Sequence, residues 1–263
     1  IFPAEAKLTP NDIYWGQMLG IAEYVRAGIT CAEENYFFTD EMLNADVKAG
    51  FRERISFGPK VNDTKSPTNY LEESYKSLSQ KCTDLITLSI FIHSIYTINE
   101  QSILDTLTFA RKHNIPVGIH LSETLTEVGD CTTKNKDQTP PQYLETLGFF
   151  DRPNALCAHC VHMDKDDLQI LADYDASIAT NPSSNIKLAS GIPPIYAMLN
   201  KGINVCIGTD GVASNNSLDM FKEMFLTACL PKANLYMPDV VTAKQVLKMA
   251  TINGAKALGI NAG

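Results

Sequence analysis

The sequence lacks several features that mark common classes of protein, and each absence excludes something. No stretch approaches the roughly 18 consecutive apolar residues that a membrane-spanning helix needs, and no secretory leader opens the printed sequence. The net charge is −8 and no Lys- or Arg-rich run offsets it, which argues against a nucleic-acid-binding surface. No glycine-rich loop follows an early strand, so nothing supports nucleotide binding of the doubly wound type.

Cysteine is present, but in a number that does not suit a disulfide framework. The 263-residue chain has seven cysteines, an odd number, and free thiols in a reducing cytoplasm account for them better. Cys157 and Cys160 form an isolated CxxC pair with no second pair of ligands, so we interpret them as packing thiols. With 44% hydrophobic and 20% charged residues, the composition is that of a globular, cytoplasmic protein with a sizeable core.

Short apolar runs alternate with helical patterns along the whole chain. Thr9-Pro10 predicts a helix start, with threonine as N-cap, and this first helix is expected to end near Gly28. Strands are expected at Ile29–Glu34, Arg54–Phe57, Thr87–His93, Pro116–Ser122, Ala155–Cys160, Ser177–Thr180 and Val205–Thr209. Further helices are expected at Asp40–Ala49, Thr68–Lys81, Glu100–Asn114, Pro141–Leu147, Asp164–Tyr174, Pro194–Lys201, Leu218–Ala228 and Thr242–Leu258.

This alternation predicts βα units and a parallel sheet. The run Asn204–Gly208 is apolar without alternation, as expected for a strand buried on both faces. About seven strands preceded by a helix predict an α/β fold, a (β/α)₈ TIM barrel without its first strand, with residues 1–263 as one domain; an open doubly wound sheet is the alternative. Gly129–Pro140 is expected to be a lid or substrate loop, and Tyr14, Trp15 and Met18 are expected in the core.

Polar side chains fall at the ends of neighbouring strands. His93, His120 and His159 lie at or within two residues of the ends of three expected strands, and Asp210 follows the last strand. Because the carboxyl ends of barrel strands meet at one rim, we expect these side chains to lie close together. Imidazole and carboxylate suit a divalent transition metal such as zinc, iron or manganese, with one position open for water. Glu123 could take a proton from that water if the chain turns at the end of its strand.

Several segments of the chain resemble the amidohydrolase superfamily. They are "GIHLSET", "ALCAHCVHMDKDDLQIL", "NPSSNIKLASGIPPIYAMLNKGINVCIGTDGVASNNSLDMFKEM" and "TINGAKALGI". The nearest branch is that of the S-adenosylhomocysteine/methylthioadenosine deaminases, with triazine chlorohydrolases and guanine deaminases as relatives. The resemblance covers nearly the whole chain and is most specific over Asn181–Met224.

The resemblance implies a role for each strand-end residue. His120 matches a metal-ligand histidine and Glu123 the proton-shuttling glutamate after it. His159 matches a histidine that hydrogen-bonds the attacking hydroxide or lies at the edge of the metal shell. Asp210 matches an aspartate that binds the metal and accepts a proton. The implied cofactor is one divalent transition metal, zinc or iron.

Two further matches imply substrate-binding residues. His93, in "FIHSIYT", resembles a histidine that helps to bind substrate, and Glu5, in "FPAE", resembles the glutamate that holds ribose hydroxyls in nucleoside deaminases. The arginines that related deaminases use for the amino-acid tail of the substrate have no clear match, and Phe57 occupies one such place. This departure weakens the S-adenosylhomocysteine assignment and leaves the hydrolase class intact.

The chain also departs from the family at its ends. It contains no His-x-His pair, the motif that supplies two metal ligands in the family's first strand. It begins after the place of that strand and ends at Gly263, before the small β-sandwich domain is completed. We therefore expect a partial barrel in which His120 and Asp210, with His159 nearby, form a poor site for tight metal binding.

The predicted function is metal-dependent hydrolytic deamination of a purine-like or nucleoside substrate, with release of ammonia. A triazine chlorohydrolase, a guanine deaminase and a non-catalytic remnant barrel without metal are the alternatives. The expected partner is a small molecule, not a nucleic acid or a membrane. Because an incomplete barrel exposes the edges of its terminal strands, association into a homo-oligomer is also expected.

Overall fold

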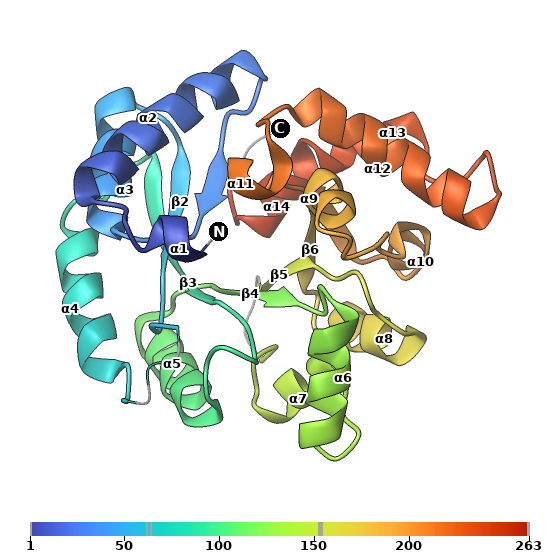
Figure 1. Cartoon of the computed structure of the whole chain (residues 1–263), viewed down its shortest axis with the longest axis horizontal. Coiled ribbons are helices and arrows are strands. Elements are labelled where there is room, and N and C mark those ends of the chain that lie inside the picture. The colour runs from blue at the N-terminus through green and yellow to red at the C-terminus, as the bar shows by residue number, and fades with distance from the viewer. Residues whose placement is uncertain (1, 62, 64, 152–154, 262–263) are drawn as a thin grey trace.

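The fold is built on one parallel sheet that curls into a partial barrel (Figure 1). The computed structural model describes residues 2–61, 63, 65–151 and 155–261. Within these ranges seven strands pair in chain order, each parallel to the next. They are β1 (Ala32–Glu34), β2 (Glu53–Phe57), β3 (Ile86–Ile92), β4 (Val117–Leu121), β5 (Leu156–His159), β6 (Ser177–Thr180) and β7 (Asn204–Ile207). The prediction of an incomplete α/β barrel is confirmed, and each strand begins and ends within three residues of its expected place.

Helices surround this sheet, with the longer ones on its outer face and several short ones near the ends of the strands (Figure 1). They are α1 (Phe2–Glu5), α2 (Pro10–Arg26), α3 (Thr39–Ala49), α4 (Thr68–Ser79), α5 (Glu100–His113), α6 (Leu125–Lys134), α7 (Pro140–Thr146), α8 (Lys165–Asp173), α9 (Pro182–Lys187), α10 (Ile195–Asn200), α11 (Val212–Asn215), α12 (Met220–Leu235), α13 (Ala243–Met249) and α14 (Ile252–Ala257). Within the described ranges, none of these helices is long and apolar enough to cross a membrane.

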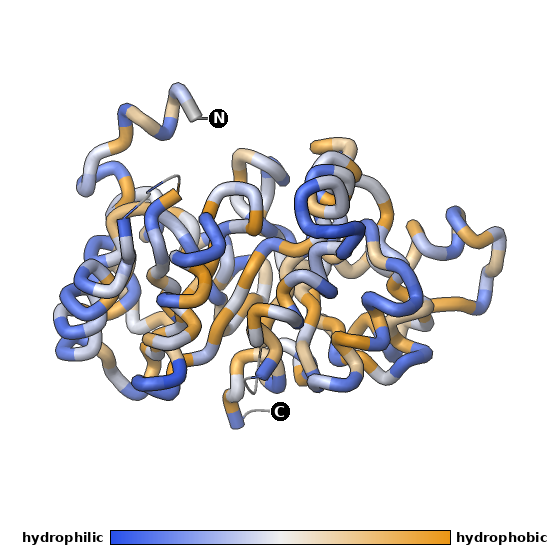
Figure 2. Tube along the Cα trace, turned by 90° about the horizontal axis from the view of Figure 1, so that it is seen from below, coloured by the Kyte–Doolittle hydropathy of each residue, from blue (hydrophilic) through white to orange (hydrophobic). Residues whose placement is uncertain are grey.

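The core lies between the strands and the surrounding helices. Ile55, Ile90, Ile119, Ile178 and Val205, one from each of five strands, are completely buried. These residues belong to one continuous apolar cluster that also includes side chains from the helices. Apolar segments accordingly run through the inner strands, and hydrophilic segments follow the outer helices (Figure 2). Every residue of β7 is buried, which explains why this strand is apolar without alternation.

Three expectations about the helices are wrong. The stretch predicted as a loop, Gly129–Pro140, is helical as far as Lys134, because Cys131 is buried and anchors α6. The helix expected over Leu218–Ala228 continues to Leu235, through Pro231. The last helix is broken into α13 and α14 at Ala250 and Thr251, where the Thr251 backbone leaves the helical region (φ −132°, ψ −98°).

The N-terminal part of α2 begins as predicted but turns a different face to the core. Thr9 and Asp12 form a capping box, and Pro10 occupies the first helical position. Ile13 is buried, whereas Trp15 is 60% exposed, so its assignment to the core is wrong. The sequence pattern of a helix identifies its apolar stripe but not which of the stripe's residues are buried. In α2 this depends on how the helix packs against the neighbouring α3 and β1.

The sheet has two edges among the described residues, β1 and β7. At β7 the side chain of Asn253, in α14, donates a hydrogen bond to the Val205 carbonyl (2.8 Å). The Asn204 side chain in turn donates to the Asn253 carbonyl (3.1 Å). An asparagine side chain thus satisfies a backbone group of this strand that no described strand pairs.

Candidate active site

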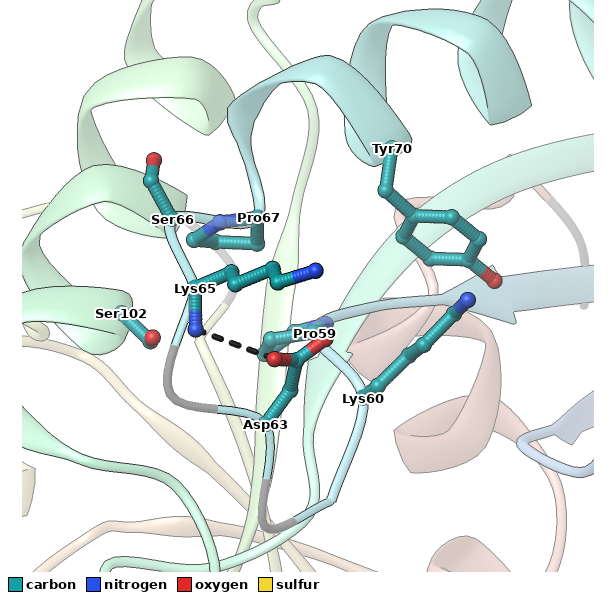
Figure 3. A pocket seen from close by; sticks show the side chains of 8 residues that line it. All are labelled: Pro59, Lys60, Asp63, Lys65, Ser66, Pro67, Tyr70 and Ser102. Carbon is teal, nitrogen blue, oxygen red and sulfur yellow. Dashed lines mark hydrogen bonds between the residues drawn. The ribbon is translucent and has the colours of Figure 1, made fainter.

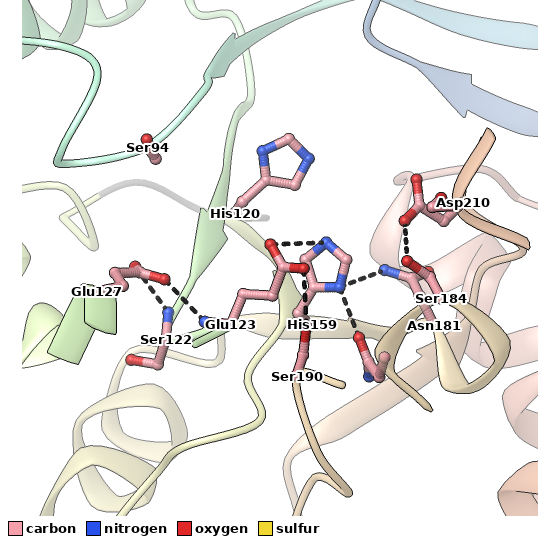
Figure 4. A network of polar contacts seen from close by, with 12 residues as sticks. Ser94, His120, Ser122, Glu123, Glu127, His159, Asn181, Ser184, Ser190 and Asp210 are labelled. Carbon is pink, nitrogen blue, oxygen red and sulfur yellow. Dashed lines mark hydrogen bonds and ion pairs between the residues drawn. The ribbon is translucent and has the colours of Figure 1, made fainter. Parts of the chain in front are cut away.

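Four of the residues singled out in the sequence, His120, Glu123, His159 and Asp210, converge at the carboxyl ends of the strands (Figure 4). His120 lies in β4 and His159 is the last residue of β5, while His93 directly follows β3. The His120 ring lies between the other two, with centroids 5.1 Å from His93 and 5.4 Å from His159. Parallel pairing of β3, β4 and β5 brings the three imidazoles to one rim.

His120 has one ring nitrogen whose lone pair is available to a metal ion. Its Nδ1 donates a hydrogen bond to the His93 carbonyl (2.8 Å), which fixes the tautomer and leaves Nε2 as the lone-pair nitrogen. Burial lowers the pKa of His120 to about 3, and the neighbouring His159 and His93 act in the same direction. The ring is therefore neutral at physiological pH, as metal binding requires.

Glu123 reaches the same rim because the chain turns sharply after β4. Ser122 has a left-handed backbone (φ 48°), which is the turn that convergence of His120 and Glu123 requires. Glu123 Oε2 lies 3.9 Å from His159 Nε2, and Ser190 Oγ donates to Glu123 Oε1 (3.2 Å). The carboxylate thus faces an imidazole and is oriented by a hydroxyl group.

His159 is buried and held by the segment that follows β6. Its Nδ1 lies 2.8 Å from Asn185 Oδ1, to which it donates, and the Asn181 side chain lies farther away, at 3.4 Å. Asn181 in turn requires glycine at position 208, because a Cβ there would lie 2.4 Å from Asn181 Oδ1. The His159 backbone is left-handed (φ 71°), so the turn after β5 is as sharp as that after β4.

Asp210 approaches the rim from β7. Its backbone is left-handed (φ 57°), and one carboxylate oxygen accepts from its neighbour's N–H, Gly211 N (2.6 Å). The other oxygen accepts from Ser184 Oγ, in α9. The segment Asn181–Asn185 therefore contacts both His159 and Asp210, which links the two sides of the site.

The two predicted substrate-binding residues come from different parts of the fold, since His93 follows β3 and Glu5 lies in α1. His93 Nδ1 is hydrogen-bonded to Thr97 Oγ1 (2.8 Å), and burial lowers the pKa of His93, opposed by the charges of Glu123 and Glu5. Glu5, in α1, accepts a hydrogen bond from Tyr36 Oη (2.7 Å). No direct contact between Glu5 and the histidines was found among the described residues, so Glu5 stands apart from the cluster.

Several residues of the site were not identified from the sequence: Glu127, Asn181, Ser184, Asn185 and Ser190. One signal was available for three of them, since the polar run NPSSN directly follows the expected strand Ser177–Thr180, and the structure shows this run to be buried. Buried polar residues at the carboxyl end of a barrel strand are unexpected unless they hold something.

The donors present fit a transition metal in type but fall short in number. The free Nε2 of His120 and the carboxylate of Asp210 are suitable ligands. Across residues 2–61, 63, 65–151 and 155–261, no group of three or more His, Cys, Asp or Glu side chains is arranged to hold a metal ion. A catalytic metal needs about three protein ligands.

Two nearby cavities are separate from the strand-end cluster. One, of about 50 Å³, is lined by residues of the loop after β2, where Lys60 lies over the Tyr70 ring at 4.7 Å (Figure 3). It has room for only a few water molecules. The other, of about 490 Å³, is lined in part by His162, in the segment after β5, and by residues of α10 and α12. Neither is lined by His120, Glu123 or Asp210.

Comparison with known proteins agrees with the resemblance to the amidohydrolase superfamily. The sequence profile described as "Amidohydrolase family" matches residues 3–263. The 5'-deoxyadenosine deaminase of Methanothermobacter thermautotrophicus is 40% identical, over 100% of this chain and 62% of its own length. The 5-methylthioadenosine/S-adenosylhomocysteine deaminase of Acetivibrio thermocellus is also 40% identical, over 98% of this chain and 60% of its own length. The chain thus spans less than two thirds of the length of these relatives.

Solved structures resemble the chain over almost its whole length. An adenosine deaminase from Xanthomonas campestris with bound zinc superposes with a TM-score of 0.91 and 32% identity, over 98% of this chain and 60% of that one. A guanine deaminase from C. acetobutylicum superposes with a TM-score of 0.87 at 22% identity, over 98% of this chain and 65% of that one. At that identity the second resemblance supports the fold alone.

Proposed function

Because the chain belongs to the amidohydrolase family, we propose that it carries most of the catalytic rim of a hydrolytic deaminase acting on an adenosine-like nucleoside. The observation that carries the proposal is the convergence of Glu123 and His159, 3.9 Å apart, beside a neutral His120 at the carboxyl ends of the strands. The deaminase relatives at 40% identity support the substrate class. Residues 1–263 would act as one barrel domain.

In this proposal Glu123 moves the protons. Water adds to the amino-bearing carbon of the purine-like ring, forming a C–O bond, and the C–N bond then breaks to release ammonia. Glu123 takes a proton from the water and delivers it to a ring nitrogen, which makes that carbon a better electrophile. His159, fixed by Asn185, orients the attacking water, and Asp210 accepts the second proton on its way to the leaving ammonia.

A divalent metal, zinc by analogy with the relative of 32% identity, is also part of the proposal. His120 Nε2 and Asp210 would be its donors in this chain. Such an ion, when bound, lowers the pKa of water to around 7. Since about three protein ligands are needed, the proposal requires a further ligand beyond those two.

Glu5 and His93 are proposed to bind the substrate. A carboxylate accepts hydrogen bonds from two neighbouring hydroxyl groups, which suits ribose, and Tyr36 orients Glu5 for this task. His93 lies beside His120, its Nε2 has no hydrogen bond among the described residues, and this nitrogen can bond to the purine-like ring.

A substrate panel tests the proposal. The chain, supplied with zinc, should release ammonia from 5'-deoxyadenosine, methylthioadenosine or adenosine in preference to guanine and aminotriazines. Hydrolysis of guanine or a triazine without any turnover of adenosine-like compounds would replace the substrate class proposed here.

A non-catalytic role is the second candidate, favoured by the lack of a three-ligand group among the described residues. In that case the barrel acts by binding alone. Elemental analysis of purified protein separates the two: one transition metal per chain contradicts the non-catalytic role, and a metal-free chain that cannot be loaded supports it.

Association with another chain is the last part of the proposal, because the edges of β1 and β7 lack strand partners within the described ranges. Analytical ultracentrifugation should detect a dimer or larger species. A monomer at all concentrations would contradict this part.

A further inference from the structure

Glu127 is a buried acid whose carboxylate binds two backbone N–H groups next to the catalytic rim. It lies in the first turn of α6 and is 4% exposed. Its Oε1 accepts from Ser122 N (2.9 Å) and its Oε2 from Glu123 N (2.8 Å), as Figure 4 shows. Both oxygens of one carboxylate therefore hold the turn from which the Glu123 side chain projects.

This geometry differs from ordinary helix capping. The N-cap of α6 is Thr124, whose hydroxyl accepts from Glu127 N (3.1 Å). In a capping box the acidic side chain at this position returns the bond to the N–H of the N-cap residue. Asp167 does so in α8, where it accepts from Asp164 N (3.2 Å). Glu127 instead accepts from the N–H groups of the two residues that precede the N-cap. Its carboxylate therefore stabilises the turn after β4 and not the helix end.

The turn held by Glu127 is also the connection to β5. The Ser122 carbonyl accepts from Val161 N (3.1 Å) and His162 N (2.9 Å). These two residues follow His159 and Cys160, which both have left-handed backbones (φ 71° and 49°). Ser122 therefore links the turn after β4 to the turn after β5. Its N–H donates to Glu127, and its carbonyl accepts from the two residues that follow Cys160. Non-glycine residues adopt such backbones only where the surroundings hold them.

We propose that Glu127 is a positioning residue that fixes Glu123 and, through the Ser122 backbone, the turn carrying His159. It acts entirely through backbone groups and touches no reacting atom. Its effect on catalysis rests on the proposed function, whereas its effect on the positions of Glu123 and His159 does not. Two hydrogen bonds from neighbouring backbone N–H groups to one buried carboxyl group select one conformation of the turn.

Glu127→Gln tests this role with little change in shape. The amide keeps one acceptor oxygen but places an NH₂ group against the second N–H, so one of the two bonds is lost. In ¹H–¹⁵N spectra of the whole chain, the amide signals of Ser122 and Glu123 should shift. Signals of Val161, His162 and the His159 ring should shift with them, although no hydrogen bond joins these residues to Glu127 among the described residues.

Thr124→Ala is the matched control, because it removes the N-cap bond at the same helix end and leaves the carboxylate in place. Its shifts should be confined to the start of α6. The proposal is overturned if Glu127→Gln also changes only the start of α6. Turnover is not needed for either spectrum, so failure of the deaminase proposal leaves this test intact.

Hydrogen exchange of the unmodified chain provides a second test if the variant does not fold. The amides of Ser122, Glu123, Val161 and His162 should exchange with a common opening free energy, since one residue's backbone links them. Independent exchange at the two turns would contradict the proposal. Where turnover is measurable, Glu127→Gln should lower kcat and leave KM unchanged relative to Thr124→Ala.

Discussion

At the scale of single residues, Gly208 shows how closely the site is packed. A methyl group at this position would lie 2.4 Å from Asn181 Oδ1, and Asn181 contacts His159. Gly208→Ala should therefore destabilise the chain by about 1–3 kcal/mol, the usual cost of overpacking. Urea denaturation measures the change.

The control for this substitution is Gly16→Ala, in α2, where a Cβ meets nothing within 4 Å. Alanine in a helix interior is favoured over glycine by about 0.5–1 kcal/mol, so this variant should be more stable than the original chain. Equal stability of the two variants would mean that Asn181 is free to move away from Gly208.

Glu5 permits a second prediction at this scale, about the sugar. If Glu5 holds ribose hydroxyls, the chain should bind a ribonucleoside about tenfold more tightly than its 2',3'-dideoxy analogue, the value of one good charged hydrogen bond. Glu5→Gln should lose most of this preference, and Tyr36→Phe, which removes the hydroxyl that orients Glu5, should lose part of it. Calorimetric titration with both nucleosides decides the matter: an unchanged preference in Glu5→Gln would remove Glu5 from the site.

At the scale of elements, a group of buried carboxyls lies between the first two strands and the helices α2 and α3. Gln17, in α2, donates to Asp46 Oδ1 (2.9 Å) and to both oxygens of Glu53 (3.1 and 3.0 Å). Tyr24 donates to Glu34 in the same region. Burial raises the pKa of Glu53 to about 11, and the charges of Glu34 and Asp46 add to this effect.

This shift makes the packing of α2 and α3 sensitive to pH. A carboxyl whose pKa is raised in the folded chain binds its proton more tightly there than in the unfolded chain. Its contribution to stability is therefore complete below about pH 4.5 and is lost as the pH rises towards 11. The loss is at most about 1.4 kcal/mol per pH unit for this group. Glu53→Gln, which remains neutral, should flatten the decline of the urea midpoint between about pH 6 and 10, whereas an equal decline in both proteins would contradict the shift.

The elements also show what local sequence patterns can predict. Strands with buried apolar runs, such as residues 90–92 of β3, were placed correctly because burial on both faces requires consecutive apolar residues. The break between α13 and α14 had no such signal, since no proline or glycine lies at Ala250 or Thr251. The helix α6 was missed for the opposite reason: most of its residues are polar, and its two buried residues are Glu127 and Cys131.

At the scale of the whole molecule, topology makes part of the site predictable. Parallel strands in chain order bring their carboxyl ends together, so the sequence alone is enough to group His93, His120 and His159. The partners that orient these histidines cannot be found in this way. Ser190 lies 67 residues from Glu123 in the sequence, and Asn185 lies 26 residues from His159. Such contacts depend on loop conformations that no local pattern specifies.

The activity proposed for the whole molecule requires that this rim performs hydrolysis by proton transfer through Glu123. The most direct measurement is ammonia release from methylthioadenosine by the zinc-supplied chain, compared with its Glu123→Gln variant. Removal of a general acid–base group should lower the rate by about 10²–10⁴-fold, with the unfolding midpoint little changed. Ammonia release at equal rates by the two proteins would contradict the account.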